Sequence, residues 1–423
     1  MLISVRLNNI NIFDREIEFS MCADMRQKRF SSNVITGNCI NIVKTALIIG
    51  PNNAGKTNFI KGIRGIKGIL LNQGFSLMAK NIFSDDEISE FRVEFLENNK
   101  IYSFEVKLCL QRSEVLYERF VEIIYDKYKN KKERIIYIRD NISSEYACDN
   151  EELKNSMEVV ARNNLLFYLL DTSKFDVLQE AKNHITLFAS SIDTIDMNNI
   201  PIQKTIDMMK SNKVLQKKIS NFVVNADLSM DDFRYLSDDE VVINLNNTDN
   251  TDDVRYQENA LAASAPLIEM LHLSSRYNGV QVPSIFYDSA GTKKIAALAG
   301  YIIDALEHGR ILVVDEIDNS LHFKLTRAII AMFNNDLNNK AQLICTTHDV
   351  SLLDCKKLLR KEQIWFAHKD KDGVYLYSLA EFTADKDKVR DTTDLIEKYK
   401  MGVFGAIPEP DLFNSLQEVY TSV

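Results

Sequence analysis

The sequence lacks any apolar run of the roughly 18 to 20 residues that are needed to cross a bilayer. The best candidate, residues 295–306, is interrupted by Asp304 and flanked by lysines. The N-terminus alternates apolar and polar residues and therefore has no signal-peptide core. We expect a soluble, cytoplasmic protein that does not associate with a membrane.

Cysteine is scarce, and its spacing carries no metal signal. No C-x-x-C pair and no Cys/His spacing suited to zinc occurs among the six cysteines, at positions 22, 39, 109, 148, 345 and 355. Reduced thiols in a cytoplasm are the simpler interpretation. Internal repeats and sustained heptads are also missing, which argues against a repeat protein or a long coiled coil.

The composition is that of a globular protein. The 423 residues include 45% hydrophobic and 26% charged residues, which excludes a collagen-like, mucin-like or wholly disordered chain. With 51 Lys+Arg against 60 Asp+Glu, the formal net charge is −9. This acidic balance argues against a histone-like surface and favours a protein partner over DNA, although a local basic patch remains possible.

Residues 50–57 carry the clearest chemical motif. They read Gly-Pro-Asn-Asn-Ala-Gly-Lys-Thr and fit G-x-x-x-x-G-K-[ST], a loop whose backbone amides cradle nucleotide phosphates. An apolar strand pattern at 46–49 precedes it, and helical spacing follows over 57–71. We expect Lys56 to reach the β- and γ-phosphates and Thr57 to ligate Mg²⁺. The predicted nucleotide-binding residues are Gly50, Asn52, Asn53, Ala54, Gly55, Lys56, Thr57 and Asn58.

A second acidic element follows an apolar strand. Residues 311–316 read Ile-Leu-Val-Val-Asp-Glu, so two carboxylates stand where the strand ends. Asp315 is placed to hold the Mg²⁺ shell, as the second carboxylate of such sites does. Glu316 is placed to orient or deprotonate the attacking water.

A third element distinguishes between kinds of NTPase. Ser289-Ala-Gly291-Thr precedes the helical run 293–306, so a second set of helix amides faces a possible anion. A small Ser-x-Gly loop, a helix and a strand ending in two carboxylates resemble the signature and second carboxylate strand of ABC-type ATPases. Residues 318–322 resemble the loop that crosses between subunits in ABC-type ATPases. His348 resembles the histidine that senses the γ-phosphate in these enzymes.

Together these motifs resemble the ABC-type ATPases of the OLD, RloA and AbiLi group. These are ATP-binding proteins of phage-defence loci, such as PARIS-like or Septu-like systems, and relatives of SMC and RecF heads. The segments GPNNAGKTNF, DSAGTKK, LVVDEIDNSLH and TTHD carry the match. The resemblance implies an α/β ABC-type (SMC/RecF-like) P-loop ATPase head with an antiparallel β meander and a helical insertion.

The same resemblance implies a homodimer or a higher assembly of dimers, with ATP and Mg²⁺ at the interface. One chain would supply the catalytic residues and metal ligands Lys56, Thr57, Asp315, Glu316 and His348. The other chain would contribute Ser289 and Gly291 to the nucleotide.

The pattern along the chain predicts a discontinuous head. Two strands are expected in the first 21 residues, and alternating runs from 90 to 138 indicate an antiparallel meander. Residues 151–230 have helical periodicity, and 237–253 read as an acidic loop. Because the motifs near 50 and 315 must meet in one nucleotide site, we expect a head of 1–145 and 270–423, with a mainly helical insertion of 146–269.

Three functions remain open at the level of sequence. The first is a sensor or scaffold in antiviral defence that responds to a phage-encoded trigger and controls a separate nuclease or toxin effector, because the chain shows no second catalytic domain. The second is a DNA-binding RecF/SMC-like ATPase in repair or recombination. The third is a nucleotide-gated binding module with negligible turnover.

The DNA-binding alternative depends on a basic segment of alternating residues that could hold a phosphate backbone. A charged hairpin turn is the competing interpretation. The segment comprises Lys127, Lys129, Lys131, Lys132, Arg134 and Arg139, interleaved with Tyr125, Tyr128 and Tyr137.

Overall fold

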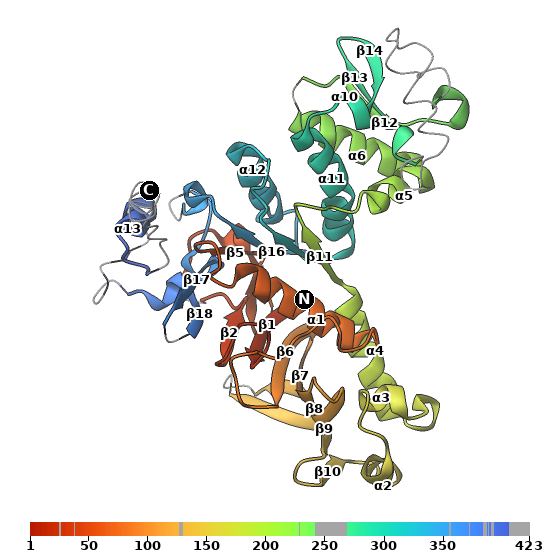
Figure 1. Ribbon diagram of the computed structural model, residues 1–423, viewed down its shortest axis with the longest axis vertical. Helices are drawn as coiled ribbons and strands as arrows, with labels where there is room; N and C mark the ends of the chain where they lie inside the picture. The colour runs from red at the N-terminus through yellow and green to blue at the C-terminus, as the bar shows by residue number, and fades with distance from the viewer. Residues whose placement is uncertain are drawn as a thin grey trace, which may run out of the picture. The chain divides into compact units, whose positions relative to one another are not determined.

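The structure is a computed structural model. It describes residues 1–24, 27–37, 39–126, 130–227, 229–241, 269–354, 357–371, 373–383, 387, 389–390 and 393–405. The chain divides into two compact units, one of Met1–Ser190 with Ile344–Val423 and one of Ser191–Leu343. Many of their helices and strands are labelled in Figure 1.

The first unit contains a seven-stranded antiparallel sheet with the order β10-β9-β8-β7-β6-β1-β2. The strands are β1 (Leu2–Asn8), β2 (Ile17–Ser20), β6 (Ser89–Glu97), β7 (Lys100–Cys109), β8 (Glu114–Tyr125), β9 (Lys131–Asp140) and β10 (Glu145–Cys148). Consecutive strands from β6 to β10 pair with one another, so the predicted meander is confirmed.

Alternating burial and a tight turn explain the first hairpin of this meander. Along β6 the side chains of Phe91, Val93 and Phe95 are buried, while the residues between them are partly exposed. Asn98 and Asn99 connect β6 to β7 with φ angles of 48° and 62°. Asparagine tolerates this left-handed conformation, and two such residues make the turn whose twist matches the strands.

A second group of strands in the first unit carries the loop at 50–57. β5 (Thr45–Ile49) pairs in parallel with β17 (Ile364–Asp370), which pairs antiparallel with β18 (Gly373–Ser378). After the loop, α1 (Lys56–Leu70) buries Ile60, Ile63 and Ile66 on one face. The predicted order of strand, loop and helix is therefore confirmed.

The remaining elements of the first unit are shorter, apart from one helix. That helix, α4 (Asp176–Ser190), packs on the meander, where the rings of Phe188 and Phe95 stack with centroids 4.4 Å apart. The others are β3 (Val34–Thr36), β4 (Asn41–Val43), α2 (Glu151–Val159), α3 (Leu166–Leu169), α13 (Leu395–Lys400) and the 3₁₀ turns η1 (Ser31–Asn33), η2 (Thr172–Lys174), η3 (Val350–Leu352), η4 (Lys361–Gln363) and η5 (Leu379–Glu381).

The second unit combines two parallel strands with helices and a small sheet. β11 (Ile192–Asp196) runs parallel to β15 (Ile311–Asp315), and their last residues, Asp196 and Asp315, are register partners. The long α11 (Ala290–His308) packs against α5 (Gln203–Ser211) and α6 (Lys213–Ala226) (Figure 1). The other elements are β12 (Asp232–Tyr235), β13 (Leu273–Tyr277), β14 (Val280–Pro283), α10 (Ser284–Tyr287) and α12 (Phe323–Phe333).

Within residues 151–230 one strand was not predicted from the sequence, and part of one predicted loop stays untested. β11 lies in the stretch 151–230 that was expected to be helical; it has only five residues, too few for a clear alternation of burial. Of the predicted acidic loop 237–253, residues 238–241 form a helical turn, and 242–253 lie outside the described residues. β16 (Gln342–Thr347) contains the boundary between the two units.

The predicted α/β fold class is confirmed, whereas the division into a head and an insertion at 146–269 stays a prediction. Among the described residues, no helix combines the length and apolar character needed to cross a membrane.

Candidate nucleotide site

Two glycines fix the path of the loop between β5 and α1. A Cβ atom on Gly50 would lie 2.2 Å from the carbonyl oxygen of Ala367 in β17. Gly55 has φ +103°, and a Cβ atom there would lie 2.8 Å from a side-chain carbon of Val374. Only glycine fits both positions, so the loop backbone closes tightly and leads its amides into the first turn of α1.

Lys56, the first residue of α1, turns its side chain back over this loop. The side chain is buried, and Nζ donates hydrogen bonds to the carbonyl oxygens of Gly50 at 2.7 Å and Pro51 at 2.9 Å. The next residue, Thr57, is exposed. The ammonium group is thus held at the loop, and a hydroxyl is open to solvent beside it.

The donors of this loop suit the phosphates of a nucleotide. Asn52 and Asn53 are exposed, and Asn53 has φ 64°, a conformation that turns successive amides toward one side. Asn11 supports the far end of the loop by donating from Nδ2 to the carbonyl oxygen of Asn58 at 3.0 Å. Helix amides, an ammonium and a hydroxyl form the donor set that Mg²⁺-bound triphosphates use.

His348 lies in the same unit, directly after β16. Its side chain is exposed. The turn around it is ordered by Asp349, whose backbone amide donates to Thr347 Oγ1 at 2.9 Å and whose side chain accepts from the Ser351 amide at 2.8 Å. These bonds restrain the backbone that follows His348.

The two predicted carboxylates belong to the second unit and differ in setting. Asp315 ends β15 and is buried, with 6% of its surface exposed. Glu316 follows with φ 55°, a left-handed conformation that is uncommon for a residue other than glycine, asparagine or aspartate. The chain therefore leaves the strand sharply at Glu316, and its carboxylate projects away from the strand direction.

Two asparagines hold the Glu316 carboxylate. Asn198 and Asn319 each donate from Nδ2 to Oε2 of Glu316 at 3.3 Å. No sequence motif indicated Asn198, which lies 118 residues from Glu316 in the connection after β11. Only the parallel pairing of β11 with β15 brings it there.

Ser289 caps the helix that it was predicted to precede. Its Oγ accepts from the amide of Thr292 at 3.1 Å, and the Thr292 hydroxyl donates to Oδ2 of Asp227 at 2.7 Å. Ser289 is exposed and Gly291 is partly exposed. A Cβ atom on Gly291 would lie 3.0 Å from the carbonyl oxygen of Ser320, so a larger residue would crowd the turn after β15.

The buried Asp288 fixes the approach to Ser289. Its carboxylate accepts hydrogen bonds from Ser275 at 2.7 Å, Ser284 at 2.5 Å and Tyr277 at 2.9 Å. Burial, followed by the bond to this carboxylate, raises the pKa of the Tyr277 hydroxyl. Three hydroxyl donors on one buried carboxylate tie the residue before Ser289 to β13 and α10.

The predicted site residues therefore form two sets, each arranged within its own unit. The loop residues, Lys56, Thr57 and His348 lie in the first unit. Ser289, Gly291, Asp315 and Glu316 lie in the second unit. Their joint action in one nucleotide site stays a prediction.

Only part of the basic segment in β8 and β9, among its described residues, is open to a phosphate backbone. Arg139 and Tyr137 are fully buried, so neither reaches a nucleic acid. Lys131 bonds to Glu94 at 3.0 Å, and carboxylates also face the remaining described cations of the segment, Lys132 and Arg134. Residues 127–129 lie outside the described part of the chain.

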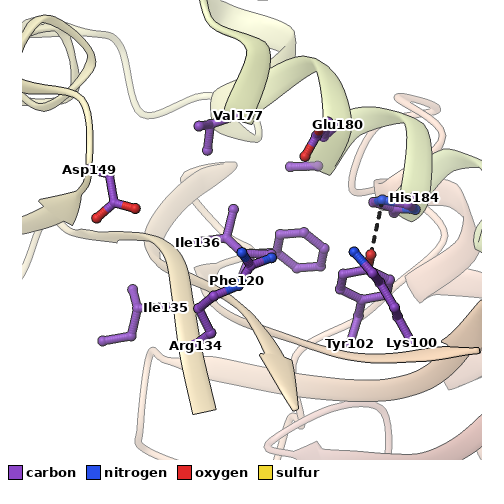
Figure 2. Close-up of a pocket in the computed structure, with 11 residues that line it drawn as sticks. Lys100, Tyr102, Phe120, Arg134, Ile135, Ile136, Asp149, Val177, Glu180 and His184 are labelled. Carbon is purple, nitrogen blue, oxygen red and sulfur yellow. Dashed lines mark hydrogen bonds between the residues drawn. The ribbon is translucent and has the colours of Figure 1, made fainter. Parts of the chain in front are cut away.

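A cavity of about 110 Å³ in the first unit contains none of the predicted site residues (Figure 2). Tyr102 and Phe120 of the meander form one wall, and His184 of α4 faces them. The Tyr102 hydroxyl and His184 Nε2 are 3.1 Å apart, and Nδ1 of the histidine bonds Glu97 at 2.9 Å. Charged side chains, those of Lys100, Arg134, Asp149 and Glu180, also line this cavity.

Strand, glycine loop and helix with a buried loop lysine define a P-loop nucleotide-binding protein. The family model described as "AAA domain, putative AbiEii toxin, Type IV TA system" matches residues 46–354, more than half of the chain. The chain belongs to this family. No match was found among curated proteins.

Three solved structures similar to this chain are SMC heads. The SMC head domain from Thermotoga maritima is 11% identical, with a TM-score of 0.43, over 89% of this chain and 98% of that chain. An SMC head bound to the C-terminal winged-helix domain of ScpA is 12% identical, with a TM-score of 0.45, over 89% and 97%. An SMC head with an extended coiled coil, bound to the C-terminal domain of ScpA derived from Pyrococcus furiosus, is 12% identical, with a TM-score of 0.42, over 94% and 99%.

The family match confirms the coarser part of the prediction, a P-loop ATPase. Assignment to the OLD, RloA and AbiLi group in particular stays a prediction.

Proposed function

We propose that this chain binds ATP with Mg²⁺ and hydrolyses it to ADP and phosphate as an ABC-type ATPase. The observation that carries the proposal is the buried Lys56 in a loop whose glycines at 50 and 55 admit no side chain. A loop that binds phosphates through backbone amides needs this close approach.

Each predicted residue has a role in the proposed reaction. The loop from Gly50 to Asn58 binds the phosphates, with Lys56 on the β- and γ-phosphates. Thr57 and Asp315 would hold Mg²⁺, which would neutralise phosphate charge. Glu316 orients the attacking water and takes its proton as the water oxygen bonds the γ-phosphorus and the bond to the β-phosphate oxygen breaks. His348 contacts the γ-phosphate.

The proposal includes assembly of two copies around the nucleotide. Ser289 and Gly291, at the start of α11, would meet the nucleotide bound by another copy. The support is that Ser289 is exposed and Gly291 partly exposed at the N-terminus of a 19-residue helix, where amides attract anions. ATP would then favour the closed assembly because it contacts both copies only in that state.

The reaction is tested by measuring phosphate release with Mg²⁺ and ATP for the wild type and Glu316→Gln. The variant keeps the shape of the side chain but cannot accept a proton, so we expect ATP binding without turnover. Glu158→Gln, at an exposed carboxylate of α2, is the matched control and should keep the wild-type rate. Undiminished hydrolysis by Glu316→Gln would remove Glu316 from the mechanism, and absence of turnover in the wild type would favour a nucleotide-gated binding module.

The biological setting that we propose is antiviral defence in the cytoplasm. The chain would hold or release a separate nuclease or toxin effector, with a phage-encoded trigger changing its state. Its support is the family description, which names a putative toxin of a type IV toxin–antitoxin system. Purification with the neighbouring gene product, followed by mass measurement with and without ATP, tests this. If no neighbour associates in either state, the role as a scaffold is wrong.

A DNA-associated ATPase is the alternative, and the exposed cations of β9 favour testing it. The Lys132 and Arg134 side chains are 70% and 61% exposed, although both face carboxylates. A shift with duplex DNA that weakens with salt and is lost in a Lys132→Glu/Arg134→Glu variant would favour a role in repair or recombination. No shift at low salt would exclude this surface as a DNA-binding site.

A further inference from the structure

The Glu316 carboxylate is held by side chains from two separate segments of the second unit. Asn198 follows β11, and Asn319 follows β15 in the same turn as Glu316. Nδ2 of each lies 3.3 Å from Oε2 of Glu316, and Asn319 Nδ2 also donates to Oδ1 of Asn198 at 2.7 Å. The three side chains therefore form a closed ring of hydrogen bonds.

The hydrogen-bond partners of each amide decide which end faces the carboxylate. Asn198 Oδ1 accepts from Asn319, while its Nδ2 also donates to Asp196 Oδ1 at 3.0 Å. Asn319 Oδ1 accepts from Lys294 Nζ at 2.9 Å. A flip of either amide would bring its oxygen against a carboxylate and its NH₂ group against another donor. Both asparagines therefore present donors to Glu316.

The backbone alone does not direct the Glu316 side chain. Its φ of 55° takes the residue out of the strand, so the alternation of β15 no longer sets its direction. A glutamate side chain also has three rotatable bonds, and an exposed one samples several rotamers. Donors from two segments restrict this freedom to conformations that keep Oε2 beside both amides.

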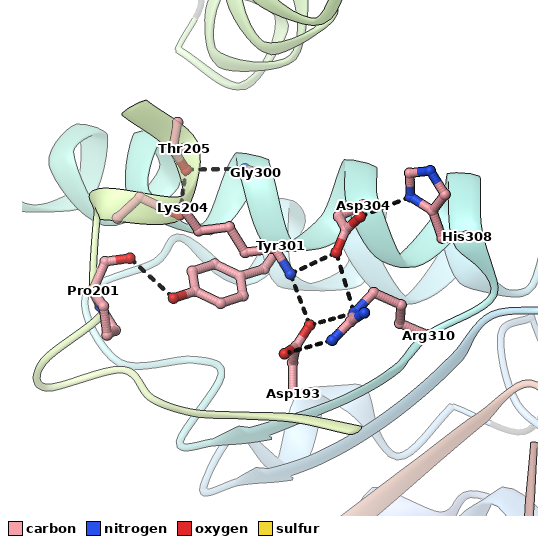
Figure 3. A network of polar contacts seen from close by, with 10 residues as sticks. Asp193, Pro201, Lys204, Thr205, Gly300, Tyr301, Asp304, His308 and Arg310 are labelled. Carbon is pink, nitrogen blue, oxygen red and sulfur yellow. Dashed lines mark hydrogen bonds and ion pairs between the residues drawn. The ribbon is translucent and has the colours of Figure 1, made fainter. Parts of the chain in front are cut away.

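The strand that leads to Asn198 is anchored by a network of charges (Figure 3). Asp193 in β11 accepts from Arg310 Nε at 2.7 Å and from Lys204 Nζ at 2.8 Å. Lys204 also pairs with Asp304 of α11 at 2.6 Å. Although burial acts to raise it, the bonds from Arg310 and Lys204 hold the pKa of Asp193 below its usual value. The network thus ties β11, α5 and α11 together.

Neutral contacts tie the segment after Asn198 to the same helix (Figure 3). The Tyr301 hydroxyl donates to the carbonyl oxygen of Pro201 at 3.1 Å. Thr205 Oγ1 donates to the carbonyl oxygen of Ala297 at 2.8 Å and accepts from the Gly300 amide at 3.1 Å. The connection between β11 and α5 is therefore fixed at both ends, which gives Asn198 a defined place.

The same helix reaches the ring directly through Lys294. Its Nζ donates to Oδ1 of Asn319 at 2.9 Å and to Oγ of Ser320 at 3.1 Å. Lys294 stands three residues after Gly291 in α11. A shift of the start of α11 would therefore move the amide that faces Glu316.

We propose that Asn198 and Asn319 are positioning residues that hold Glu316 for the attack of water, and that Lys294 links their arrangement to the start of α11. This inference rests on the proposed role of Glu316 in ATP hydrolysis. It deepens that role, because the conformation of the carboxylate then depends on the helix expected to meet the nucleotide of a second copy.

The test compares Asn198→Ala with Asn198→Asp in steady-state phosphate release by the full chain with Mg²⁺ and ATP. Alanine removes the donor. Aspartate keeps the shape but turns a carboxylate against that of Glu316. A positioning role predicts a kcat lower by about 10- to 100-fold for both variants, with KM nearly unchanged and with aspartate the more damaging. Asn199→Asp, at an exposed neighbour, adds the same charge and should keep the wild-type kcat.

If Asn198 had only a structural role, Asn198→Asp would lower kcat less than Asn198→Ala, because aspartate has the same shape as asparagine. That order, or a wild-type kcat for Asn198→Asp, would overturn the inference. Asn319→Ala and Asn319→Asp repeat the comparison from the other side of the ring, so poor folding of one variant does not prevent the test. An active Glu316→Gln would instead overturn the proposed role of Glu316 on which this inference rests, whereas an inactive Glu316→Gln with an active Asn198→Asp would overturn this inference alone.

Discussion

Glu118 and Arg139 form an ion pair in which both side chains are 0% exposed, with 3.0 Å between Oε2 and Nε. Arg139 also donates to the carbonyl oxygens of Ala161 and Asn164, and Glu118 accepts from the amide of Leu166 at 3.0 Å. Burial raises the pKa of Glu118, and Arg139 offsets part of that effect. The pair therefore joins β8 and β9 to the segment before α3.

Replacing Arg139 with methionine should lower the free energy of unfolding by about 3–5 kcal/mol, because a buried carboxylate loses its partner. Denaturant unfolding of the purified variant measures this. Arg134→Met is the control on the same strand. Arg134 is 61% exposed and its partner Glu122 keeps a second cation, Lys100, at 3.9 Å, so the loss should be no more than about 1 kcal/mol. Equal losses in the two variants would contradict the assignment of Arg139 to the interior.

Lys56→Ala should weaken ATP binding by about 10- to 100-fold, because a charged hydrogen-bond donor to the phosphates is lost. Titration calorimetry with ATP and Mg²⁺ measures the affinity. Lys61→Ala removes the same charge from the exposed side of α1 and should bind ATP like the wild type. An unchanged affinity for Lys56→Ala would argue that nucleotide does not bind at this loop.

Asp227→Ala should weaken ATP-dependent assembly. Asp227 accepts the Thr292 hydroxyl at 2.7 Å, so its removal loosens the turn that contains Gly291. The mass of the Glu316→Gln protein with ATP, with and without the added Asp227→Ala change, measures the effect. Asp207→Ala, at an exposed residue of α5, is the control. Assemblies of the same mass and affinity in both proteins would show that Asp227 does not support the interface.

The pH dependence of stability should reveal Asp193. Its pKa is lower in the folded chain than in the unfolded chain, so its contribution is present above the unfolded value of about 3.9 and is lost as the pH falls through the folded value. Asp193→Asn should therefore cost about 1–3 kcal/mol at neutral pH and progressively less below about pH 4. Unfolding curves from pH 7 to 3 measure the difference. The prediction would be wrong if the difference in free energy of unfolding did not change with pH. It would also be wrong if Asp336→Asn, at an exposed residue, gave the same difference.

The sequence predicted those parts of the fold that depend on local pattern. Apolar residues every three or four positions marked α1, and alternation marked the strands of the meander, because each periodicity reflects one buried face. The glycines of the loop were predicted from the motif alone. The structure adds the reason for Gly50, a carbonyl oxygen of Ala367 that lies 317 residues away in sequence.

Features that depend on distant pairing were not predictable. β11 is short, and only its register with β15 places Asn198 beside Glu316. The left-handed conformation of Glu316 also had no sequence signal, because glutamate rarely adopts it. Arg139 was interpreted as part of a basic surface because the sequence does not indicate its partner. That partner, Glu118, lies on the neighbouring strand and becomes apparent only from the pairing of β8 with β9.

The backbone of Glu316 has a consequence for the evolution of this chain. At a φ of 55°, a residue with a Cβ atom is strained by roughly 1 kcal/mol, and glycine is not. Glu316→Gly should therefore fold at least about as stably as the wild type while lacking the carboxylate. Laboratory selection for heat resistance alone would tolerate or even enrich this change, so a thermostable descendant of this protein should be screened for turnover as well as for melting temperature.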